Sequence, residues 1–393
     1  MTSDTGPWTL TRMGSFRFLT AGESHGPGLT IVVEGMPAGV PISEEHIAVD
    51  LRRRQGGYGR GGRMLIEEDY AYITAGVTRG VTTGAPIALT IENKDYANWK
   101  DKVPPPITVP RPGHADLSGA LKYQLDDMRL VLERSSARET TSRVAAAGIA
   151  KALLGELGVH VAGHVVAIGG VQAPVSTLPW AELFDRAEES EVRCEDTEAS
   201  RRMIERIDEA KANRDTLGGV VEIVAWGLAP GVGSFVHWDR KLDGRLAGAV
   251  MSINAIKGVE IGDGFGAAAR PGTQVQDAIR MREGRLIRAT NRAGGTEGGV
   301  TNGEPIVVRA AMKPISTTLT PQPSVDVKTG LETVMEYQRS DICAVPAAAV
   351  VVEAMVAIVL ADTYLEKFAG DNIAETRANM EHFLSSIGWT ALV

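Results

Sequence analysis

The chain has 393 residues, a length that suits one large domain or two smaller ones. Its apolar fraction of 44% and charged fraction of 23% are ordinary for a globular protein, and its net charge of −8 argues against a general nucleic-acid-binding function. A local basic pocket remains compatible with this charge, because a cleft lined by one sign of charge concentrates its own field.

Two further counts narrow the class of protein. The sequence holds 44 glycines without a collagen-like period, which indicates many tight turns or backbone lying close to ligands. Its two cysteines, Cys194 and Cys343, form neither a CxxC pair nor a disulfide framework. No apolar signal segment stands at the N-terminus, so we expect a cytoplasmic protein.

In chain order, residues 1–15 show no core periodicity, and we expect a non-catalytic extension before one catalytic unit of residues 16–393. Five prolines in residues 93–113 predict an exposed loop, since that run can be neither helix nor central strand. The charge-dense residues 180–215 predict a solvated helical excursion. The other predicted elements, in order, are strand 29–34, helix 44–54, helix 136–157, strand 161–168, strand 220–226, helix 242–256, strand 306–311 and helix 344–368.

The last of these segments is the longest apolar stretch of the chain. It contains Pro346 and Glu353, so we expect a buried core helix and not a membrane span. Because helices and strands do not alternate regularly along the chain, the order favours an α+β layered architecture over a doubly wound parallel sheet.

The pentapeptide Gly22-Glu23-Ser24-His25-Gly26 matches the G-x-S-x-G pattern of the α/β-hydrolase nucleophile elbow. An elbow leads from a strand directly into a helix, whereas here a turn and a second strand follow. A serine–histidine pair on a hairpin turn still offers a general acid beside a hydroxyl. For this pentapeptide alone, a turn histidine without a catalytic role is the simpler interpretation.

Arginines and glycines interleave over residues 51–63. Ser43 is a candidate helix N-cap and Gly56 a candidate C-cap, and arginines in the last helical turn complement the helix dipole. An RGG-like RNA-binding tract is a weak alternative, since there is one copy in an acidic protein. Five arginines within twelve residues exceed what capping requires. They favour a polyanionic small molecule, because guanidinium groups bind phosphate and carboxylate bidentately.

The segment RPGHAD ends the proline-rich loop and carries a second histidine. His114 has Gly113 before it and Asp116 close behind it, and the aspartate can fix the tautomer of the ring. Taken alone, such a residue is more often a structural loop histidine.

The segment ERSSARET precedes a long alanine-rich helix. Ser136 and Glu139 have the spacing of a capping box, in which the cap is typically worth ~1 kcal/mol. Arg134 and Ser135 at a helix N-terminus would also form an anion site, with free N–H groups facing a phosphate. The two interpretations are compatible.

The C-terminal half adds glycine pairs suited to close backbone approach, and polar segments that offer cations and hydroxyls. No GxGxxG opens a βαβ unit, so a Rossmann dinucleotide site is not indicated. No HExxH motif and no Cys/His/carboxylate cluster suggests a metal. The polar segments are Asn254-Ala255, GGTEGG at 294–299, KPIST at 313–317 and Arg339-Ser340-Asp341.

Taken together and in this order, these segments resemble the chorismate synthase family. Composition and periodicity alone indicate no more than a soluble α+β enzyme for an anionic substrate. The motifs that carry the resemblance run from about Phe16 to Glu353: GESHG, RRRQGGYGRGGRM, RPGHAD, RSSARETxxRVAA, GDGF, NRAGGxEGGxTNG, KPIST and RSDxCAVPAA.

The resemblance implies a β-α-β sandwich, with helices between antiparallel sheets, and a homotetramer. It implies a lyase of the shikimate pathway of aromatic amino acid biosynthesis. The family reaction is a 1,4-elimination of phosphate from 5-enolpyruvylshikimate 3-phosphate, and it depends on reduced FMN although nothing is oxidised overall. Some relatives reduce their own flavin with NADPH; the compact length favours the type that relies on an external flavin reductant.

The resemblance also implies site residues. His25 matches the histidine that protonates the leaving phosphate, His114 the histidine against the flavin ring, and Asp341 the aspartate near the flavin nitrogen that receives hydrogen. Arg54 and Arg60 match positions described as NADPH-binding, although we expect their main partner to be the substrate's phosphate and carboxylates. The positions that match FMN contacts are Arg134, Ser135, Ser136, Asn254, Ala255, Gly298, Lys313, Pro314, Ile315, Ser316, Thr317 and Arg339.

Overall fold

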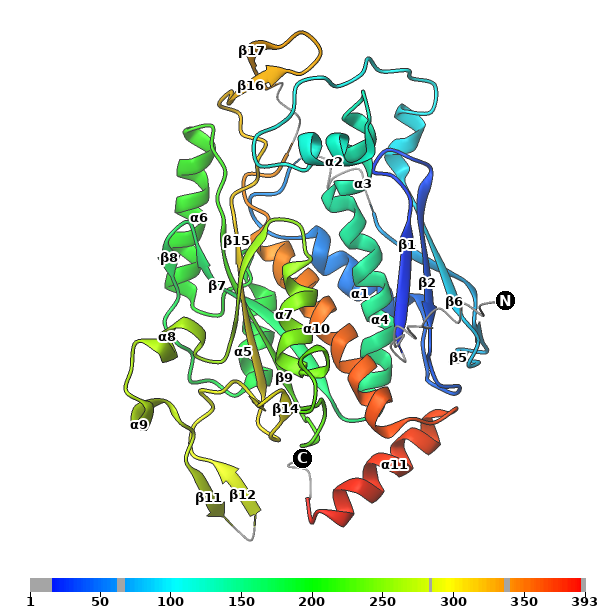
Figure 1. The fold of residues 1–393 in the computed structure, drawn as a ribbon, viewed down its shortest axis with the longest axis vertical. Coiled ribbons are helices and arrows are strands. Elements are labelled where there is room, and N and C mark those ends of the chain that lie inside the picture. The colour runs from blue at the N-terminus through cyan, green and yellow to red at the C-terminus, as the bar shows by residue number, and fades with distance from the viewer. Residues whose placement is uncertain (1–15, 62–67, 283–284, 336–339, 390–393) are drawn as a thin grey trace, which may run out of the picture.

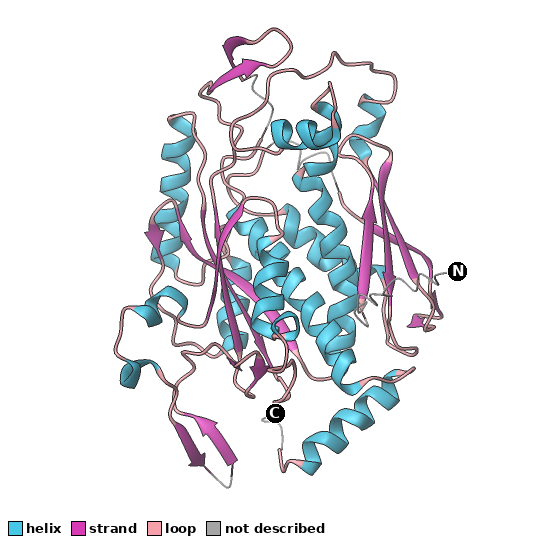
Figure 2. Ribbon diagram, in the orientation of Figure 1, coloured by secondary structure: helices cyan, strands magenta, loops and turns pink. Residues whose placement is uncertain are grey.

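A computed structural model describes residues 16–61, 68–282, 285–335 and 340–389. In this part of the chain a layer of helices lies between two antiparallel sheets, as Figures 1 and 2 show. The predicted α+β class and the β-α-β sandwich are therefore confirmed.

The helices fall into a central group and a peripheral group. The central group comprises α1 (Glu44–Gln55), α4 (Thr140–Glu156), α7 (Leu242–Met251) and α10 (Val345–Phe368). The peripheral helices are α2 (Asp116–Tyr123), α3 (Arg129–Ser135), α5 (Trp180–Glu189), α6 (Thr197–Ala212), α8 (Gly264–Ala268), α9 (Gly272–Val275) and α11 (Ile373–Ser386), with 3-10 turns η2 (Lys94–Asn98), η3 (Ala137–Glu139) and η4 (Trp238–Arg240).

The first sheet has four strands in the order β1-β2-β6-β3. Its inner face alternates strictly: the buried side chains of β2 pair across the register with buried side chains of β6, as in Leu29 opposite Ile91 and Ile31 opposite Leu89. This face packs on α4 and α1. The strands are β1 (Arg17–Ala21), β2 (Gly28–Glu34), β3 (Ala71–Ala75) and β6 (Ile87–Glu92), and β4 (Val77–Thr78) pairs with β5 (Val81–Thr82) beside them.

The second sheet has five strands in the order β10-β15-β9-β7-β8, and α10 packs on β7, β9 and β15. The strands are β7 (His160–Ile168), β8 (Val171–Gln172), β9 (Gly219–Trp226), β10 (Ile256–Ile261) and β15 (Ile306–Met312). Two hairpins extend from the body: β11 (Ile279–Arg282) with β12 (Arg285–Arg288), and β16 (Pro323–Asp326) with β17 (Leu331–Val334). A third hairpin, β13 (Thr296–Glu297) with β14 (Val300–Thr301), packs beside α7.

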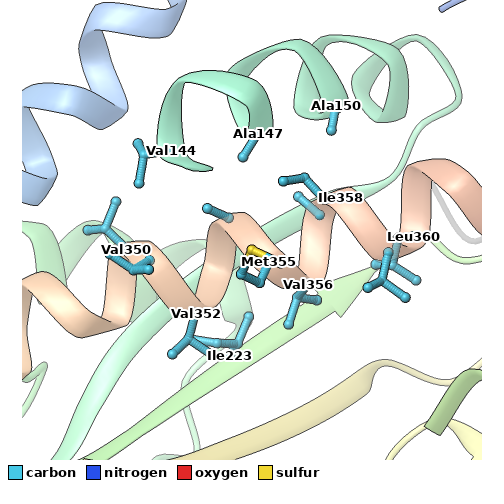
Figure 3. Close-up of a cluster of buried hydrophobic side chains, with 14 of the residues drawn as sticks. Val144, Ala147, Ala150, Ile223, Val350, Val352, Met355, Val356, Ile358 and Leu360 are labelled. Atoms are coloured by element: carbon cyan, nitrogen blue, oxygen red, sulfur yellow. The ribbon is translucent and has the colours of Figure 1, made fainter. Parts of the chain in front are cut away.

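Helix α10 is the centre of the core. It contacts α1, α4, α7 and the second sheet, so it is enclosed on all sides. Figure 3 shows Val144 of α4 above Val350 of α10 and Ala147 above Met355, with Ile223 of β9 beside Val352 on the other side. The helix is long and apolar enough to cross a membrane, but its most apolar stretch is 100% buried inside the protein. The predicted core helix is confirmed.

One charged network interrupts this apolar core, and we call it the buried charge network: Asp50, Arg53, Lys151, Glu188, Arg193 and Glu353. Glu353 of α10 is 1% exposed and accepts hydrogen bonds from Arg53 at 2.7 and 2.9 Å and from Lys151. Three carboxylates face three cations, so the network is neutral as a whole. The network joins α1, α4, α5 and α10. Its charges are paired because an unpaired charge in this interior would be costly.

The structure corrects several predicted elements. The predicted helix 136–157 begins at Thr140, because the 3-10 turn η3 precedes it. Ser136 caps this turn by accepting the N–H of Arg138 at 3.3 Å, so it does not form the predicted capping box with Glu139. The predicted helix 242–256 ends at Met251, since Ile256 already starts β10. The predicted loop 93–113 contains η2 but otherwise no helix or strand.

The segment 180–215 was predicted as solvated, and this was wrong for one face of each of its helices. Leu183 and Phe184 of α5 cover Val224 on the outer side of the second sheet. Met203 and Ile207 of α6 belong to the main core. Both helices are amphipathic, so the dense charges occupy only their outer faces.

Candidate active site

The GESHG segment forms the turn of the β1–β2 hairpin, as the sequence predicted. Gly22 has a φ of +112°, and a Cβ there would lie 2.4 Å from the carbonyl oxygen of Gly28, so only glycine closes this turn. A strand enters and a strand leaves, which contradicts the nucleophile-elbow interpretation because an elbow must lead into a helix. The turn therefore presents His25 and not a hydrolase serine.

His25 is held by a carboxylate from α3. Its Nδ1 lies 2.7 Å from Glu133 Oε1, and its backbone N–H donates to Glu133 Oε2 at 2.8 Å. The indole of Trp99 packs against the imidazole at an interplanar angle of 39°, with ring centroids 4.1 Å apart. Burial opposes ionisation of Glu133, but the hydrogen bonds from the ring and backbone of His25 lower the pKa of its carboxyl below the ordinary value.

His114 has a similar arrangement on the RPGHAD loop. Its Nδ1 lies 2.6 Å from Oδ1 of Asp116, the buried first residue of α2. Arg111 donates to the same carboxylate at 2.8 and 2.9 Å and approaches the imidazole at 3.0 Å. Burial opposes ionisation of Asp116, yet the bonds from Arg111 and His114 hold the pKa of this carboxyl well below its usual range. The aspartate partner predicted for this histidine is confirmed.

The end of α3 connects the first turn to the second half of the chain. Arg134 donates to Thr20 O at 2.9 Å and remains exposed. The Asn254 side-chain amide donates to the carbonyl oxygen of Ser135 at 2.7 Å. The Ser135 hydroxyl oxygen is buried and has no hydrogen-bond partner in the described part of the chain.

Ala255 and the KPIST segment extend this series of contacts to the RPGHAD loop. Ala255 has a φ of +67°, a left-handed conformation that is strained for a residue with a Cβ. Its carbonyl oxygen accepts from the Lys313 N–H at 2.9 Å, and the Lys313 ammonium donates to Gly113 O at 2.6 Å, beside His114. Strained backbone that neighbouring contacts hold in place is typical of ligand sites.

Asp341 lies at the other end of the KPIST segment. Its carboxylate pairs with Arg60 at 3.2 Å and accepts from the Gly61 N–H at 2.6 Å. Ser340 Oγ donates to the carbonyl oxygen of Thr317 at 2.8 Å, which ties this loop to KPIST. The intervening Pro314, Ile315 and Ser316 are at least partly exposed, and Ile315 O accepts from Thr216.

The two arginines matched to anion binding differ in environment. Arg54 is buried, and its guanidinium donates to Thr140, Asp69 and the carbonyl oxygen of Ala137. Burial lowers the pKa of its guanidinium to about 10, although the Asp69 carboxylate opposes this shift. Arg60 lies on the glycine-rich loop beside Asp341. The structure thus gives Arg54 a set of internal partners and places Arg60 among the other site residues.

One matched residue lies elsewhere in the chain. Gly298 forms the β13–β14 turn, near the bottom of Figure 1, whereas α2 and α3 lie near the top. The two regions flank opposite ends of β15, since Val307 bonds to Gly294 and Lys313 follows Met312. Seven strand residues span ~20 Å, so the structure does not bring Gly298 to the other residues. Arg339 lies outside the described residues.

Sequence reasoning missed several residues that hold His25 and Arg138 in place through hydrogen bonds. Glu133 was visible within a motif but carried no assigned role. Asp69 and Asn93 were not singled out, yet both are buried and bond the Arg138 guanidinium, with Asn93 Oδ1 accepting at 2.7 and 2.9 Å. Their contacts with Arg138 and His25 join residues 45 to 108 positions apart, so no local pattern reveals them.

The arrangement suits acid–base chemistry on an anion. Two imidazoles, each paired with a carboxylate, are connected through a series of hydrogen bonds and ion pairs that also includes exposed or partly exposed cations. No group of three His, Cys, Asp or Glu side chains able to hold a metal occurs in the described residues.

The comparisons with known proteins identify the family of the chain. A sequence profile described as chorismate synthase matches residues 16–365. Chorismate synthase of Moorella thermoacetica is 55% identical over 383 residues, covering 94% of this chain and 100% of the relative, and that of Syntrophotalea carbinolica is 54% identical over 380 residues, covering 94% and 98%. A crystal structure of chorismate synthase superposes with a TM-score of 0.78 at 44% identity, covering 95% of this chain and 98% of the other. The chain therefore belongs to the chorismate synthase family and is a carbon–oxygen lyase of that kind.

Proposed function

We propose that this protein converts 5-enolpyruvylshikimate 3-phosphate to chorismate by 1,4-elimination of phosphate. The observation that carries this proposal is that two histidines, each paired with a carboxylate, are connected through a series of contacts that also includes Arg60, Arg134 and Lys313. In the reaction the ring carbon–oxygen bond to phosphate and one ring carbon–hydrogen bond break, and a second ring double bond forms. The family membership supports the same reaction.

The charge of the substrate supports the assignment. Two carboxylates accompany a phosphate of about −1.5 to −2 charge, and FMN would add a further phosphate. The protein has a net charge of −8, so only local cations can compensate these groups. Arg60 is our candidate for the substrate's anions, because its guanidinium lies on a glycine-rich loop beside Asp341. Arg54 would have an indirect role, through its hydrogen bonds to Asp69 and Thr140.

The residues at the junction of α3, Asn254 and KPIST fit a flavin mononucleotide. Ser135 offers a buried hydroxyl without a described partner, Ala255 holds a strained backbone, and Lys313 offers a cation. We propose that these residues, with Arg134, Ser136 and Thr317, hold FMN. Bound there in its reduced form, FMN would supply one-electron donor chemistry for the breaking of the carbon–oxygen bond to phosphate.

The roles of the other residues follow from their partners. His25 would give a proton to the departing phosphate, since its ring is held against Glu133 and an ionised partner stabilises imidazolium. His114 would stabilise negative charge on the flavin ring, with Asp116 fixing its orientation. Asp341, oriented by Arg60 and the Gly61 N–H, would lie where the ring hydrogen leaves.

Phosphate release tests the proposal directly. Under anaerobic conditions, the protein should release phosphate from 5-enolpyruvylshikimate 3-phosphate with chemically reduced FMN. Oxidised FMN should bind without supporting turnover, and air should stop the reaction. Sustained chorismate formation in air, with oxidised FMN and no reductant, would contradict the mechanism.

We further propose a cytoplasmic homotetramer that obtains reduced flavin from an external reductant. The same assay separates the two sources of reduced flavin. Oxidised FMN with NADPH should give no turnover until a flavin reductase is added. Turnover with NADPH and FMN alone would show that the protein reduces its own flavin.

A further inference from the structure

Both carboxylate oxygens of Glu133 bind the same histidine. Oε1 lies 2.7 Å from Nδ1 of His25, and Oε2 accepts the His25 backbone N–H at 2.8 Å. The Glu133 carbonyl oxygen also accepts the backbone N–H of Ser24 at 3.0 Å. One residue of α3 thus fixes both the main chain of the turn and the ring that the turn carries.

We propose that Glu133 is a positioning residue, which keeps a proton on Nδ1 of His25 and leaves Nε2 as the nitrogen that exchanges a proton with the substrate. This inference rests on the proposed function of His25 as the acid. It assigns that role to one ring nitrogen and makes it depend on a residue from another element.

The tautomer follows from the chemistry of the carboxylate. An ionised carboxylate can only accept hydrogen bonds, so the ring nitrogen against Oε1 must carry the hydrogen. Glu133 is ionised, because its contacts with His25 lower the pKa of its carboxyl. In the described part of the chain, no residue bonds to His25 Nε2. The proton that His25 delivers would therefore leave from Nε2.

The surroundings keep the ring in this orientation. The tilted indole of Trp99 packs against the imidazole, and its N–H donates to Asp95 at 3.2 Å, which fixes the indole in turn. His25 and Glu133 are 19% and 14% exposed, so solvent competes little for their contact. The other charged groups near the pair are Arg129, which acts on Glu133, the neighbouring Glu23 and Arg134, and Lys102 over the Trp99 ring.

A purely structural role is the alternative, in which Glu133 only anchors the turn. Glu133→Gln separates the two roles. The Gln amide oxygen can still accept the backbone N–H of His25, so the turn keeps its anchor. Its NH₂ group then faces Nδ1 and favours the tautomer with hydrogen on Nε2, and the compensating negative charge is lost.

The experiment combines tautomer and kinetic measurements on the full-length protein. The chain has seven histidines, so ¹⁵N-histidine labelling gives few signals, and His25→Gln identifies the one from His25. At a pH where the ring is neutral, the wild type should show hydrogen on Nδ1 and Glu133→Gln should show it on Nε2. The kcat of Glu133→Gln should fall at least tenfold, and by no more than the ~10²–10⁴-fold expected for losing a general acid, with KM and FMN affinity unchanged.

A matched control is Glu156→Gln, which removes a carboxylate paired with Arg377 at 2.6 Å at the far end of α4. It should leave both the His25 spectrum and kcat unchanged. Hydrogen on Nε2 in the wild type would overturn the proposal even if Glu133→Gln failed to fold. Wild-type kcat in Glu133→Gln would overturn it as well. Failure of the proposed function is a separate result, because a wild type without phosphate release would still reveal the tautomer.

Discussion

Replacing Glu353 by glutamine would remove one of the three carboxylates of the buried charge network. Its side chain is 1% exposed and compensates both Arg53 and Lys151. The variant leaves one uncompensated positive charge in the core. Breaking a buried ion pair from one side costs about 3–5 kcal/mol, so we expect a loss of this size in the free energy of unfolding.

The pH dependence of stability gives a second measure of the same network. Burial would raise the pKa of Asp50, but its ion pairs with Lys151 and Arg53 outweigh this and bring it from 3.8 to about 2. Because the folded-state pKa lies below the unfolded value, the contribution of Asp50 is complete above about pH 4 and is lost as the pH falls toward 2. A shift of this size corresponds to about 2–3 kcal/mol.

Urea unfolding at neutral pH measures the loss. Glu353→Gln should unfold at a much lower urea concentration than the wild type. The double variant Glu353→Gln/Lys151→Met, which restores neutrality, should recover part of the difference. The surface control Glu156→Gln should cost about 1 kcal/mol or less. If Glu353→Gln cost no more than this control, the network would not be a buried ionic structure and the reasoning would be refuted.

Three further predictions concern the site. His25→Ala should lower kcat by about 10²–10⁴-fold while flavin binding, followed by absorbance, stays intact; near-normal turnover would remove His25 from the mechanism. Arg60→Ala should weaken substrate binding by about tenfold or more, since a charge-assisted hydrogen bond is worth roughly 1.5–3 kcal/mol, and a change confined to FMN affinity would show that the assignment is wrong. Ala255→Gly should leave thermal stability unchanged or raise it. Glycine relieves left-handed strain of about 1–2 kcal/mol in the folded state, whereas its greater freedom in the unfolded chain costs about 0.4–1 kcal/mol. A clear loss of thermal stability would contradict the strain argument.

Periodicity predicted the elements whose burial is decided locally. The strand predicted at 29–34 and the helix predicted at 44–54 match β2 and α1 to within one residue at each end. Ser43 caps α1 as expected, accepting from the N–H of His46 at 3.2 Å. Element ends that depend on distant contacts were predicted less well. The chain after Met251 leaves the helix because Ile256 joins the edge of the second sheet, which no local pattern announces.

The site was predictable in part, for the same reason. The motif positions gave His25, His114, Arg60 and Lys313, which the fold links through contacts between distant segments. The sequence did not reveal that Arg54 would be enclosed by internal partners, because exposure is set by Asp69 and α4. The position of Gly298, at the far end of β15, likewise follows from the sheet topology alone.

The central position of α10 also affects how the protein can fold as it is synthesised. The helix occupies Val345–Phe368 of a 393-residue chain, yet α1, α4, α7 and the second sheet all pack on it. When the ribosome has made the chain as far as β15, which ends at Met312, α10 is still missing, and these elements lack the apolar surface that they cover in the native state. The nascent chain therefore exposes hydrophobic faces until α10 emerges, and partly folded chains with such faces tend to aggregate. We expect its folding yield to depend strongly on chaperones that bind such faces, and truncations before α10 to be insoluble.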